Sequence, residues 1–430
     1  MREPLRIAVA GLGTVGVGVL RVLRDNAALI RARAGRALQV VAVSARHRGR
    51  DRGVDIADLT WCDDVLDLAR LAGVDAVVEL IGGDDGPAKA LTEAAIAAGK
   101  PVVTANKALL AVHGTDLARA AERAGVTLAY EAAVAGGVPI VKALREGLGA
   151  NRIGRVHGIL NGTCNYILTE MRETGRDFDA VLAEAQALGY AEADPGTDID
   201  GIDAAHKLAI LTSLAFGTVV NFGAVYVAGI RHIGALDIAY AGELGYRIKL
   251  LGIARETADG IEQRVHPCMV PERSPIAAVD GVFNAVVVDG DFVERTVFEG
   301  QGAGQGPTAS AVVADLIDLA AGRRPPTFGV PAAALREATW APMSGHVGPY
   351  YVRLQVYDRP GVIADISAIL RDEAISIESL LQRGRSASEA VPVVLISHEA
   401  EEAAMRRAFG RIGELESVLE PPRLIRIETL

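Results

Sequence analysis

The sequence predicts an α/β protein built from three folding units: a doubly wound parallel sheet, a mixed α+β unit and a small β-α-β-β-α-β unit. Three observations support this prediction. Apolar, strand-like runs alternate with alanine-rich helical stretches over residues 1–135, which is typical of a parallel sheet with helices on both faces. From residue 136 the helical stretches come first and long β-like runs follow. Prolines and glycines then separate residues 350–430 from the rest.

The first unit, residues 1–135, is expected to contain five strands with helices between them. Its best strand candidate, residues 5–10, is followed by helical periodicity at 17–24. The remaining elements are expected as strands at 40–43, 74–80, 101–104 and 127–130, and as helices at 88–98 and 117–124. A helix near 305–322, with its strongest pattern at 309–321, is expected to complete this unit.

The second unit, residues 136–304, is expected to be a mixed α+β domain. Its expected helices lie near 163–173, 177–188 and 200–215, and its β-like runs lie at 248–255, 261–270 and 282–288. A linker follows at 323–349, because Pro325 and Pro326 end the preceding helix.

The third unit, residues 350–430, has the pattern of a ferredoxin-like layer. Strands are expected at 350–356, 375–382, 391–397 and 423–427, and helices at 362–372 and 399–412.

Composition excludes several classes of protein. The net charge of −10 argues against a nucleic-acid-binding protein, which usually has a basic face. No uncharged apolar run is long enough for a membrane span, and we expect no secretory signal. The cysteines, Cys62, Cys164 and Cys268, form no CxxC pair, so we expect a cytoplasmic protein without structural zinc. The histidines lack ligand spacing, so we expect no transition-metal site.

A glycine motif predicts a dinucleotide site in the first unit. Gly11-x-Gly13-x-x-Gly16 follows a strand and opens a helix, with Thr14 and Val15 at the helix start. In such a motif the first glycine makes a tight turn, the second admits a pyrophosphate and the third allows close helix packing. The unit is therefore expected to be Rossmann-like. The alternative is an ordinary glycine turn in a sheet protein.

The end of the second strand bears on the choice of cofactor. A site for NAD(H) usually has an acid there for the ribose 2′-hydroxyl, but here Arg46 comes first and the first acid is Asp51. This favours NADP(H) over NAD(H), with Arg46 as the partner of the 2′-phosphate. The alternative is a solvated basic loop.

Two lysines are candidates for chemistry on a carbonyl. Lys107 comes just after the strand that ends at Thr104, where open α/β sheets bind ligands. Asp203 and Lys207 are four residues apart and share one helix face, with Asp200 as the expected N-cap. A carboxylate beside a lysine can hold the amine for proton transfer to an alkoxide. The alternatives are a solvent-exposed strand-end lysine and a surface ion pair. His206 points in a different direction on the helix, so we expect it to lie in the core or to support the site without being catalytic.

Together these segments resemble the homoserine dehydrogenase family, over residues 5–325, and the C-terminal unit resembles an ACT domain. The segments that carry the resemblance are 104–107, 158–166, 188–195, 198–207, 302–304 and 307–309, with the motif at 358–362 for the ACT domain. Two positions depart from the family pattern. Cys164 stands where Thr or Ser is common, which makes a hydroxyl role doubtful, and Gln301 stands where Pro is common.

The resemblance implies roles for individual residues. Lys207 is implied as the proton donor to the carbonyl oxygen, Lys107 as the second active-site lysine and Asp203 as their partner. The implied substrate ligands are Glu192, at the substrate's amino group, Asp203 and Asp198. The implied cofactor contacts include Thr104, Lys107, Gly189 and Gly304. A monovalent cation, Na⁺ or K⁺, is implied at Glu131, Val134, Gly136 and Val138.

The resemblance also implies an activity. It is the NAD(P)H-dependent interconversion of aspartate 4-semialdehyde and homoserine, a step in threonine, methionine and isoleucine biosynthesis. Residues 1–135 would bind the dinucleotide, residues 136–304 would bind substrate and form the dimer, and residues 350–430 would bind threonine as a feedback inhibitor. A homodimer or homotetramer is implied. The alternatives are an enzyme acting on another amino-acid-related carbonyl, a non-catalytic amino-acid sensor, and a purely structural ACT domain.

Overall fold

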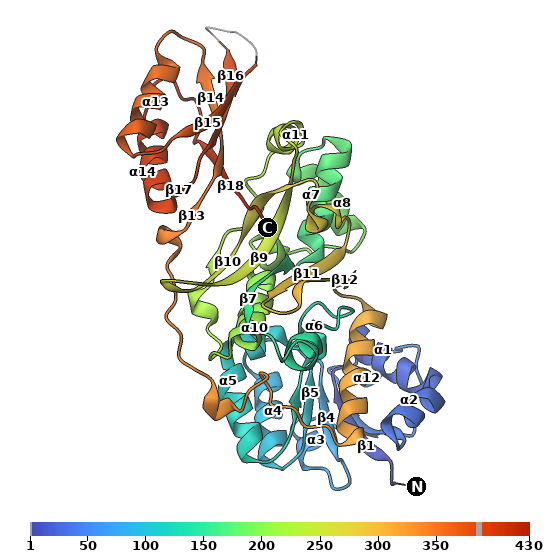
Figure 1. Ribbon diagram of the computed structural model, residues 1–430. Helices are drawn as coiled ribbons and strands as arrows, with labels where there is room; N and C mark the ends of the chain where they lie inside the picture. The colour runs from blue at the N-terminus through green and yellow to red at the C-terminus, as the bar shows by residue number, and fades with distance from the viewer. Residues whose placement is uncertain (1, 384–388) are drawn as a thin grey trace.

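The computed structural model describes residues 2–383 and 389–430, and in it the first 135 residues form a parallel sheet in the order β3-β2-β1-β4-β5-β6 (Figure 1). Successive side chains of β1 point to opposite faces of the sheet, so they pack into the apolar cores on its two sides. Ile7 and Val9 pack with one group of helices, and Ala8 and Ala10 pack with the other. The elements are β1 (Leu5–Ala10), α1 (Thr14–Asp25), α2 (Ala27–Ala34), β2 (Leu38–Ser44), β3 (Thr60–Trp61), α3 (Asp67–Arg70), β4 (Ala76–Glu79), α4 (Pro87–Ala97), β5 (Val102–Thr104), α5 (Lys107–Arg123) and β6 (Leu128–Ala129).

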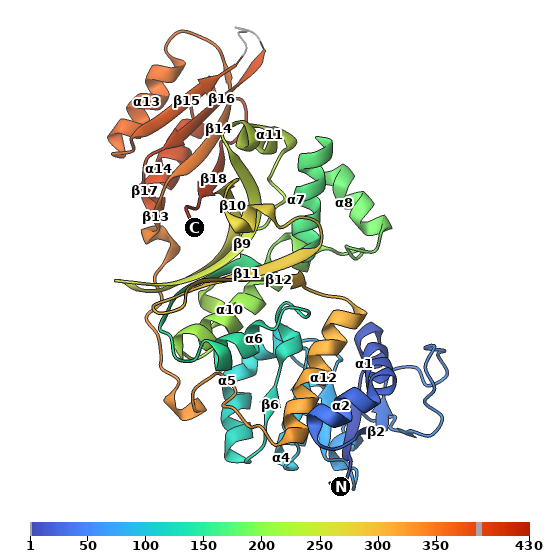
Figure 2. The same ribbon diagram turned by 45° about the vertical axis from the view of Figure 1, so that its right-hand side comes forward.

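A later helix, α12 (Gln305–Ala321), lies beside α1 and α2 at the bottom of the molecule (Figures 1 and 2). Its apolar residues share a core with α1, α2 and β1. The strand order places β2 and β4 on opposite sides of β1. The carboxyl ends of these strands therefore border the crevice in which such sheets bind ligands.

The second sheet has the order β12-β11-β7-β9-β10-β18-β14-β16-β15, with β8 also paired to β10. Helices α7, α8 and α10 share a core with β7, β9 and β10 on one face. The elements up to residue 301 are η1 (Glu131–Ala133), α6 (Ile140–Lys142), η2 (Ala143–Gly147), β7 (Ile153–Ile159), α7 (Gly162–Thr174), α8 (Phe178–Ala187), α9 (Gly196–Ile199), α10 (Ile202–Phe216), η3 (Phe222–Ala224), β8 (Tyr226–Val227), α11 (Ala235–Glu243), β9 (Tyr246–Thr257), β10 (Gly260–Pro271), η4 (Pro275–Ala278), β11 (Phe283–Gly290) and β12 (Glu294–Gln301).

The C-terminal unit extends this same sheet. Its last strand, β18, pairs in parallel with β10 and antiparallel with β14, so the chain ends in the middle of the molecule (Figure 1). Tyr350, Val352 and Leu354 of β14 pack against the unit's own helices, whereas Tyr351 faces the main core. The elements are β13 (Val347–Gly348), β14 (Tyr350–Tyr357), α13 (Val362–Asp372), β15 (Ile377–Gln382), β16 (Ala390–Ser397), β17 (Ala400–Glu401), α14 (Glu402–Gly413) and β18 (Arg423–Ile427).

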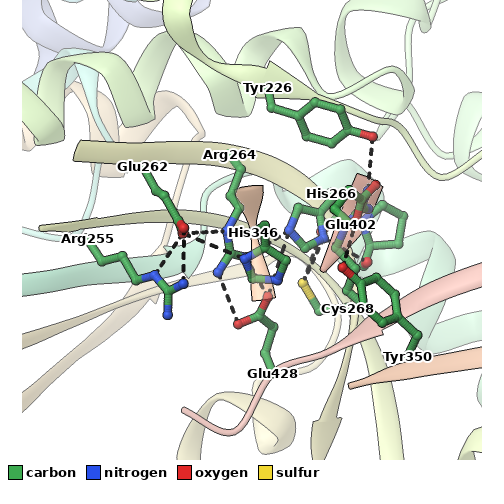
Figure 3. Close-up of polar contacts among 12 residues, drawn as sticks. Tyr226, Arg255, Glu262, Arg264, His266, Cys268, His346, Tyr350, Glu402 and Glu428 are labelled. Atoms are coloured by element: carbon green, nitrogen blue, oxygen red, sulfur yellow. Dashed lines mark hydrogen bonds and ion pairs between the residues drawn. The ribbon is translucent and has the colours of Figure 1, made fainter. Parts of the chain in front are cut away.

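A buried ion pair joins the C-terminal unit to β10 (Figure 3), and a second one lies within the unit. Arg264 on β10 pairs with Glu428, and Arg426 on β18 pairs with Glu402, whose carboxylate also accepts the Tyr350 hydroxyl at 3.0 Å. His266, Cys268 and Glu428 bring possible metal ligands together, but the Arg264 guanidinium lies 2.9 Å from His266 Nε2. An arginine side chain therefore supplies positive charge within this cluster.

The segment between α12 and β13 runs along one side of the molecule (Figure 1). Phe328 is buried and packs on Tyr130 with ring centroids 5.5 Å apart. Further on, the backbone forms two isolated parallel β-bridges: Arg336 pairs with Thr218, and Trp340 pairs with Ile261. The segment contains η5 (Ala332–Ala334) and η6 (Met343–Gly345). Within the described part of the chain, we find no helix with both the length and the apolar character that crossing a membrane requires.

Candidate active site

The candidate site centres on Asp203, which is buried near the start of α10. Its Oδ2 lies 2.7 Å from Lys207 Nζ, and its Oδ1 lies 3.0 Å from Lys107 Nζ at the start of α5. Burial favours the neutral acid, but the charges of Lys207 and Lys107 outweigh it and hold the pKa of Asp203 well below its usual range. The carboxylate is therefore ionised and held between two ammonium groups.

The two lysines differ in their surroundings. Lys207 is 8% exposed, and its Nζ also donates to the Leu160 carbonyl at 2.7 Å. An ammonium has three N–H donors, so these two contacts leave one for a bound oxygen. The Lys107 side chain is 39% exposed, and the charge of Asp203 raises its pKa despite partial burial.

Asp198 lies beside Asp203 at the end of α9. Its Oδ1 accepts a hydrogen bond from Asn161 Nδ2 at 2.8 Å. Burial and the negative charge of Asp203 raise the pKa of Asp198. Glu192 is exposed, but its charge contributes to the raised pKa of Lys107. Asp203, Asp198 and Glu192 thus all act on Lys107.

Asp200 was expected to cap α10, and this prediction is wrong. Gly201 takes the N-cap position with φ of 85°, and Asp200 instead forms an ion pair with Arg231. The left-handed conformation that ends α9 favours glycine, so the chain places Asp200 before the turn.

Cys164 is fully buried in α7. Its thiol lies 3.2 Å from the Asp198 carbonyl, and burial raises its pKa well above the usual value. The side chain therefore stays a neutral thiol that packs and makes one weak hydrogen bond. Thr163 next to it donates to the Tyr190 carbonyl at 2.8 Å and links α7 to the 189–195 segment.

The glycine turn has the geometry that its motif predicts. A Cβ on Gly11, which has φ of 96°, would lie 2.4 Å from the Leu80 carbonyl oxygen, and one on Gly16 would lie 2.0 Å from the Gly11 carbonyl oxygen. A Cβ on Gly13 would meet no atom within 4 Å. The first and third glycines therefore allow close packing, and the second leaves space at the start of α1. Thr14 and Val15 open that helix, whose N-terminal amides favour an anion.

A chain of contacts links this turn to the lysines. Leu80 follows Glu79, whose Oε2 accepts the Thr104 hydroxyl at 2.6 Å. The Thr104 hydroxyl accepts the Asn106 amide, and the Asn106 side chain caps α5, which begins with Lys107. Thr104 is fully buried, so its side chain acts by fixing the start of α5. The glycine turn and both lysines therefore lie at the same edge of the first sheet.

The basic loop after β2 lies at this edge too. Arg46 is exposed just after the strand ends at Ser44. Arg48 and Arg52 lie over the Trp61 ring, 5.9 and 5.6 Å from its centroid. Arg52 also donates to the His47 and Arg50 carbonyls, which holds the loop in shape.

The segment expected to hold a cation is buried. The Glu131 carboxylate accepts the amides of Val141 and Lys142, yet burial and Asp315 raise its pKa to about 7. Ala135 has φ of 51°, which is unusual for a residue with a side chain. Val134, Gly136 and Val138 are all in this buried loop, which packs against residues 301–308. Glu131 is thus a buried carboxylate whose charged form is disfavoured chiefly by burial and then by Asp315, while the nearby Lys142 amine pairs with Asp315.

Other predicted residues lie at turns around the site. Gly189 has φ of 76° and ends α8, and Gly304 has φ of 124° and starts α12. His206 is half-buried and packs against Phe222 with ring centroids 4.4 Å apart, and the charges of Asp203, Lys107 and Lys207 act on its imidazole. The sequence gave no individual role to Glu79, Asn106, Leu160 and Asn161, although the last three lie in segments that carry the family resemblance. Their contacts join segments far apart in the chain, although Asn161 carried a signal as the first polar residue before α7.

Comparison with known proteins identifies the family. The homoserine dehydrogenase family profile matches residues 139–317, the homoserine dehydrogenase NAD-binding domain matches residues 11–131, and the ACT domain matches residues 350–414. Homoserine dehydrogenases of Neisseria gonorrhoeae and Pseudomonas aeruginosa are each 47% identical over 100% of this chain, which covers 99% and 100% of their lengths.

Solved structures agree with these matches. A homoserine dehydrogenase from Thiobacillus denitrificans superposes with a TM-score of 0.93 and 48% identity, over 99% of this chain and 98% of that one. A hyperthermophilic archaeal homoserine dehydrogenase in complex with NADPH superposes with a TM-score of 0.63 and 25% identity, over 73% of this chain and 97% of that one. The chain therefore belongs to the homoserine dehydrogenase family of NAD(P)-dependent oxidoreductases.

Proposed function

We propose that the chain reduces aspartate 4-semialdehyde to homoserine with Lys207 as the proton donor. The observation that carries this proposal is the buried amine of Lys207, held by Asp203 and by the Leu160 carbonyl with one N–H donor left. A bound nicotinamide supplies the hydride to the aldehyde carbon. The carbonyl oxygen then takes a proton from Lys207, so that an alcohol forms and the amine becomes neutral. In the reverse direction Lys207 accepts the proton.

Lys107 is proposed to act at the mouth of the site. It is more exposed than Lys207, and it begins a helix at the strand end that faces the glycine turn. Its positive charge would steady the developing alkoxide and orient the substrate. Asp203 fixes the direction of both amines, and Glu192 and Asp198 are proposed to bind the ammonium of the substrate.

For the cofactor, we propose NADP(H) in preference to NAD(H). The pyrophosphate would meet the amides of Thr14 and Val15 above Gly13, and Arg46 would meet the 2′-phosphate. Gly189, Gly304 and Thr104 are proposed to shape the nicotinamide end. The archaeal relative was solved in complex with NADPH, which supports this choice.

A monovalent cation, Na⁺ or K⁺, is proposed in the 131–138 loop. Glu131 would supply negative charge, and the carbonyls of Val134, Gly136 and Val138 would complete the oxygen ligands. The raised pKa of the buried Glu131 carboxyl supports the proposal, because a bound cation would relieve that charge.

The ACT domain is proposed to bind threonine, the product of a later step, and to lower activity. The enzyme would then serve threonine, methionine and isoleucine biosynthesis in the cytoplasm, where its three free cysteines stay reduced. A homodimer or homotetramer is proposed, with residues 136–304 contributing to the dimer. The edge strand β12, with Val297 42% exposed, supports an association of copies.

One assay tests the proposed activity, cofactor preference and effector together. NADPH oxidation is followed with aspartate 4-semialdehyde, then with NADH, and then with threonine added. We expect rapid turnover that favours NADPH and falls with threonine. Tight NADPH binding without turnover would instead indicate a sensor, and turnover only with another carbonyl would indicate a different substrate.

A further inference from the structure

Asn161 lies in the turn between β7 and α7 and is 4% exposed. Its side chain makes three hydrogen bonds. The Oδ1 accepts the Cys164 amide at 2.8 Å, which caps α7. The Nδ2 donates to Asp198 Oδ1 and to Asp203 Oδ2, each at 2.8 Å. Both amide hydrogens are therefore used on two carboxylates of the candidate active site.

The two carboxylates need such a bridge because like charges repel at short range in a buried site. Asp203 has two lysines as counter-charges, whereas Asp198 is destabilised as an anion by burial and by Asp203. The Asn161 amide offsets this effect, because it lowers the pKa of both acids. The ionisable groups that act on this cluster are Lys107 from α5, Cys164 from α7, Glu192 and Asp200 from the acidic segment, and His206 and Lys207 from α10.

The same turn also holds Lys207. The Leu160 carbonyl accepts the Lys207 amine, and Leu160 directly precedes Asn161. β7 lies between β11 and β9 in the second sheet, which fixes the start of this turn. A Cβ on Gly162 would lie 2.7 Å from the Val282 carbonyl oxygen, so the end of the turn is closely packed as well. Two adjacent residues on a rigid turn therefore hold both members of the Asp203–Lys207 pair.

We propose that Asn161 is a positioning residue whose side-chain NH₂ fixes the Asp198 and Asp203 carboxylates so that Asp203 can orient Lys207. This role rests on the proposed function of Lys207 as the proton donor. It goes beyond helix capping, which uses only the Oδ1 atom of the amide.

Two substitutions separate positioning from capping. Asn161→Asp and Asn161→Ser both keep a side chain that caps helices well, but neither keeps the NH₂ donor. Asn221→Asp is the matched control, because Asn221 also caps a helical turn through its Oδ1 atom and lies outside the site. The readouts are the melting temperature, kcat and KM for aspartate 4-semialdehyde, and the pH profile of kcat.

If Asn161 positions the carboxylates, both variants fold and Asn161→Ser melts near the wild-type temperature, yet kcat falls about 10- to 100-fold in each. The acidic limb of the profile moves to higher pH, because the carboxylates lose a donor that favours their charged form. The shift is larger in Asn161→Asp, which adds a third carboxyl, and Asn221→Asp behaves as wild type.

Values of kcat within threefold of wild type in both variants, with an unshifted profile, would leave Asn161 as a helix cap only and overturn the proposal. A loss confined to Asn161→Asp would assign the effect to added charge and overturn it as well. Either result leaves the Lys207 proposal intact, because substitution of Lys207 tests that proposal separately.

Discussion

At the scale of the residue, the sequence predicted the Asp203–Lys207 pair but not the residues that position it. Asp203 and Lys207 are neighbours on one helix face, so their spacing alone predicted contact. The Asn161 and Leu160 contacts join residues 42 and 47 positions apart. Helical periodicity carries no information about such distant partners, which depend on how β7 packs in the second sheet.

Glu131 provides a prediction about pH and salt. Its pKa of about 7 in the folded protein lies above its ordinary value of 4.5. The folded state therefore binds more protons than the unfolded state between these values, and its stability falls as pH rises through that interval. A cation bound at Glu131 would reverse this loss at pH 8.

We expect K⁺ or Na⁺ to stabilise the wild-type protein at pH 8 by about 2 kcal/mol near saturation, relative to tetramethylammonium at equal ionic strength. Glu131→Gln should lose this ion-specific gain. Thermal unfolding in the different salts measures both. An equal K⁺ effect in Glu131→Gln would remove that carboxylate from any cation site.

At the scale of the element, strand positions followed the apolar pattern well. β18 and α13 have the bounds that the sequence predicted, and β2, β4, β5 and β10 lie within a few residues of them. Two long strands were missed: β7, which contains glycines, and β12, an edge strand whose side chains alternate between exposed and half-buried. The two-residue strands β3, β8, β13 and β17 were missed as well, because so short a run shows no alternating pattern.

Helix α5 was expected only from residue 117 but begins at Lys107. Gly114 and Thr115 interrupt the helical pattern in the sequence. In the structure a Cβ on Gly114 would lie 3.1 Å from the Phe328 ring, so this glycine admits the segment that follows α12. Gly114 therefore weakens the helical pattern in the sequence, but the packing of Phe328 against α5 requires a residue without a side chain there.

The loop after β2 gives a prediction about cofactor choice. Arg46→Glu should lower kcat/KM for NADPH by about 10-fold or more, because a carboxylate repels the 2′-phosphate, and should change kcat/KM for NADH little. Arg33→Glu is the matched control, since Arg33 is an exposed arginine on α2 and the change in net charge is the same. Equal losses with both cofactors would show that Arg46 does not read the phosphate.

At the scale of the whole molecule, the ACT domain is part of the catalytic sheet. Strand β18 pairs with β10. Arg264 on β10 is 1% exposed and pairs with Glu428, which follows β18 (Figure 3). The sequence indicated a separate C-terminal unit, but it gave no sign that the last strand would join two units. That pairing connects residues 158 positions apart, Cys268 and Arg426.

The Arg264–Glu428 pair predicts that replacing only one of the two residues lowers the free energy of unfolding. Glu428→Leu removes the nearer of two carboxylates from the buried Arg264 guanidinium, leaving Glu262 at 3.4 Å, and should lower the free energy of unfolding by about 3 kcal/mol. The double variant Arg264→Met with Glu428→Leu should recover much of that loss, because an apolar pair suits a buried site. Denaturant unfolding compares the two, and a double variant as unstable as Glu428→Leu would argue against the pair as the cause.

The whole arrangement depends on the Lys207 amine meeting the reacting oxygen. The most direct measurement is kcat for aspartate 4-semialdehyde reduction by Lys207→Met, alongside the dissociation constant of NADPH. The account predicts that kcat falls about 10³-fold while NADPH binds as tightly as in wild type, because the amine acts on the substrate oxygen and not on the cofactor. A Lys207→Met enzyme that keeps kcat within tenfold of wild type would contradict it.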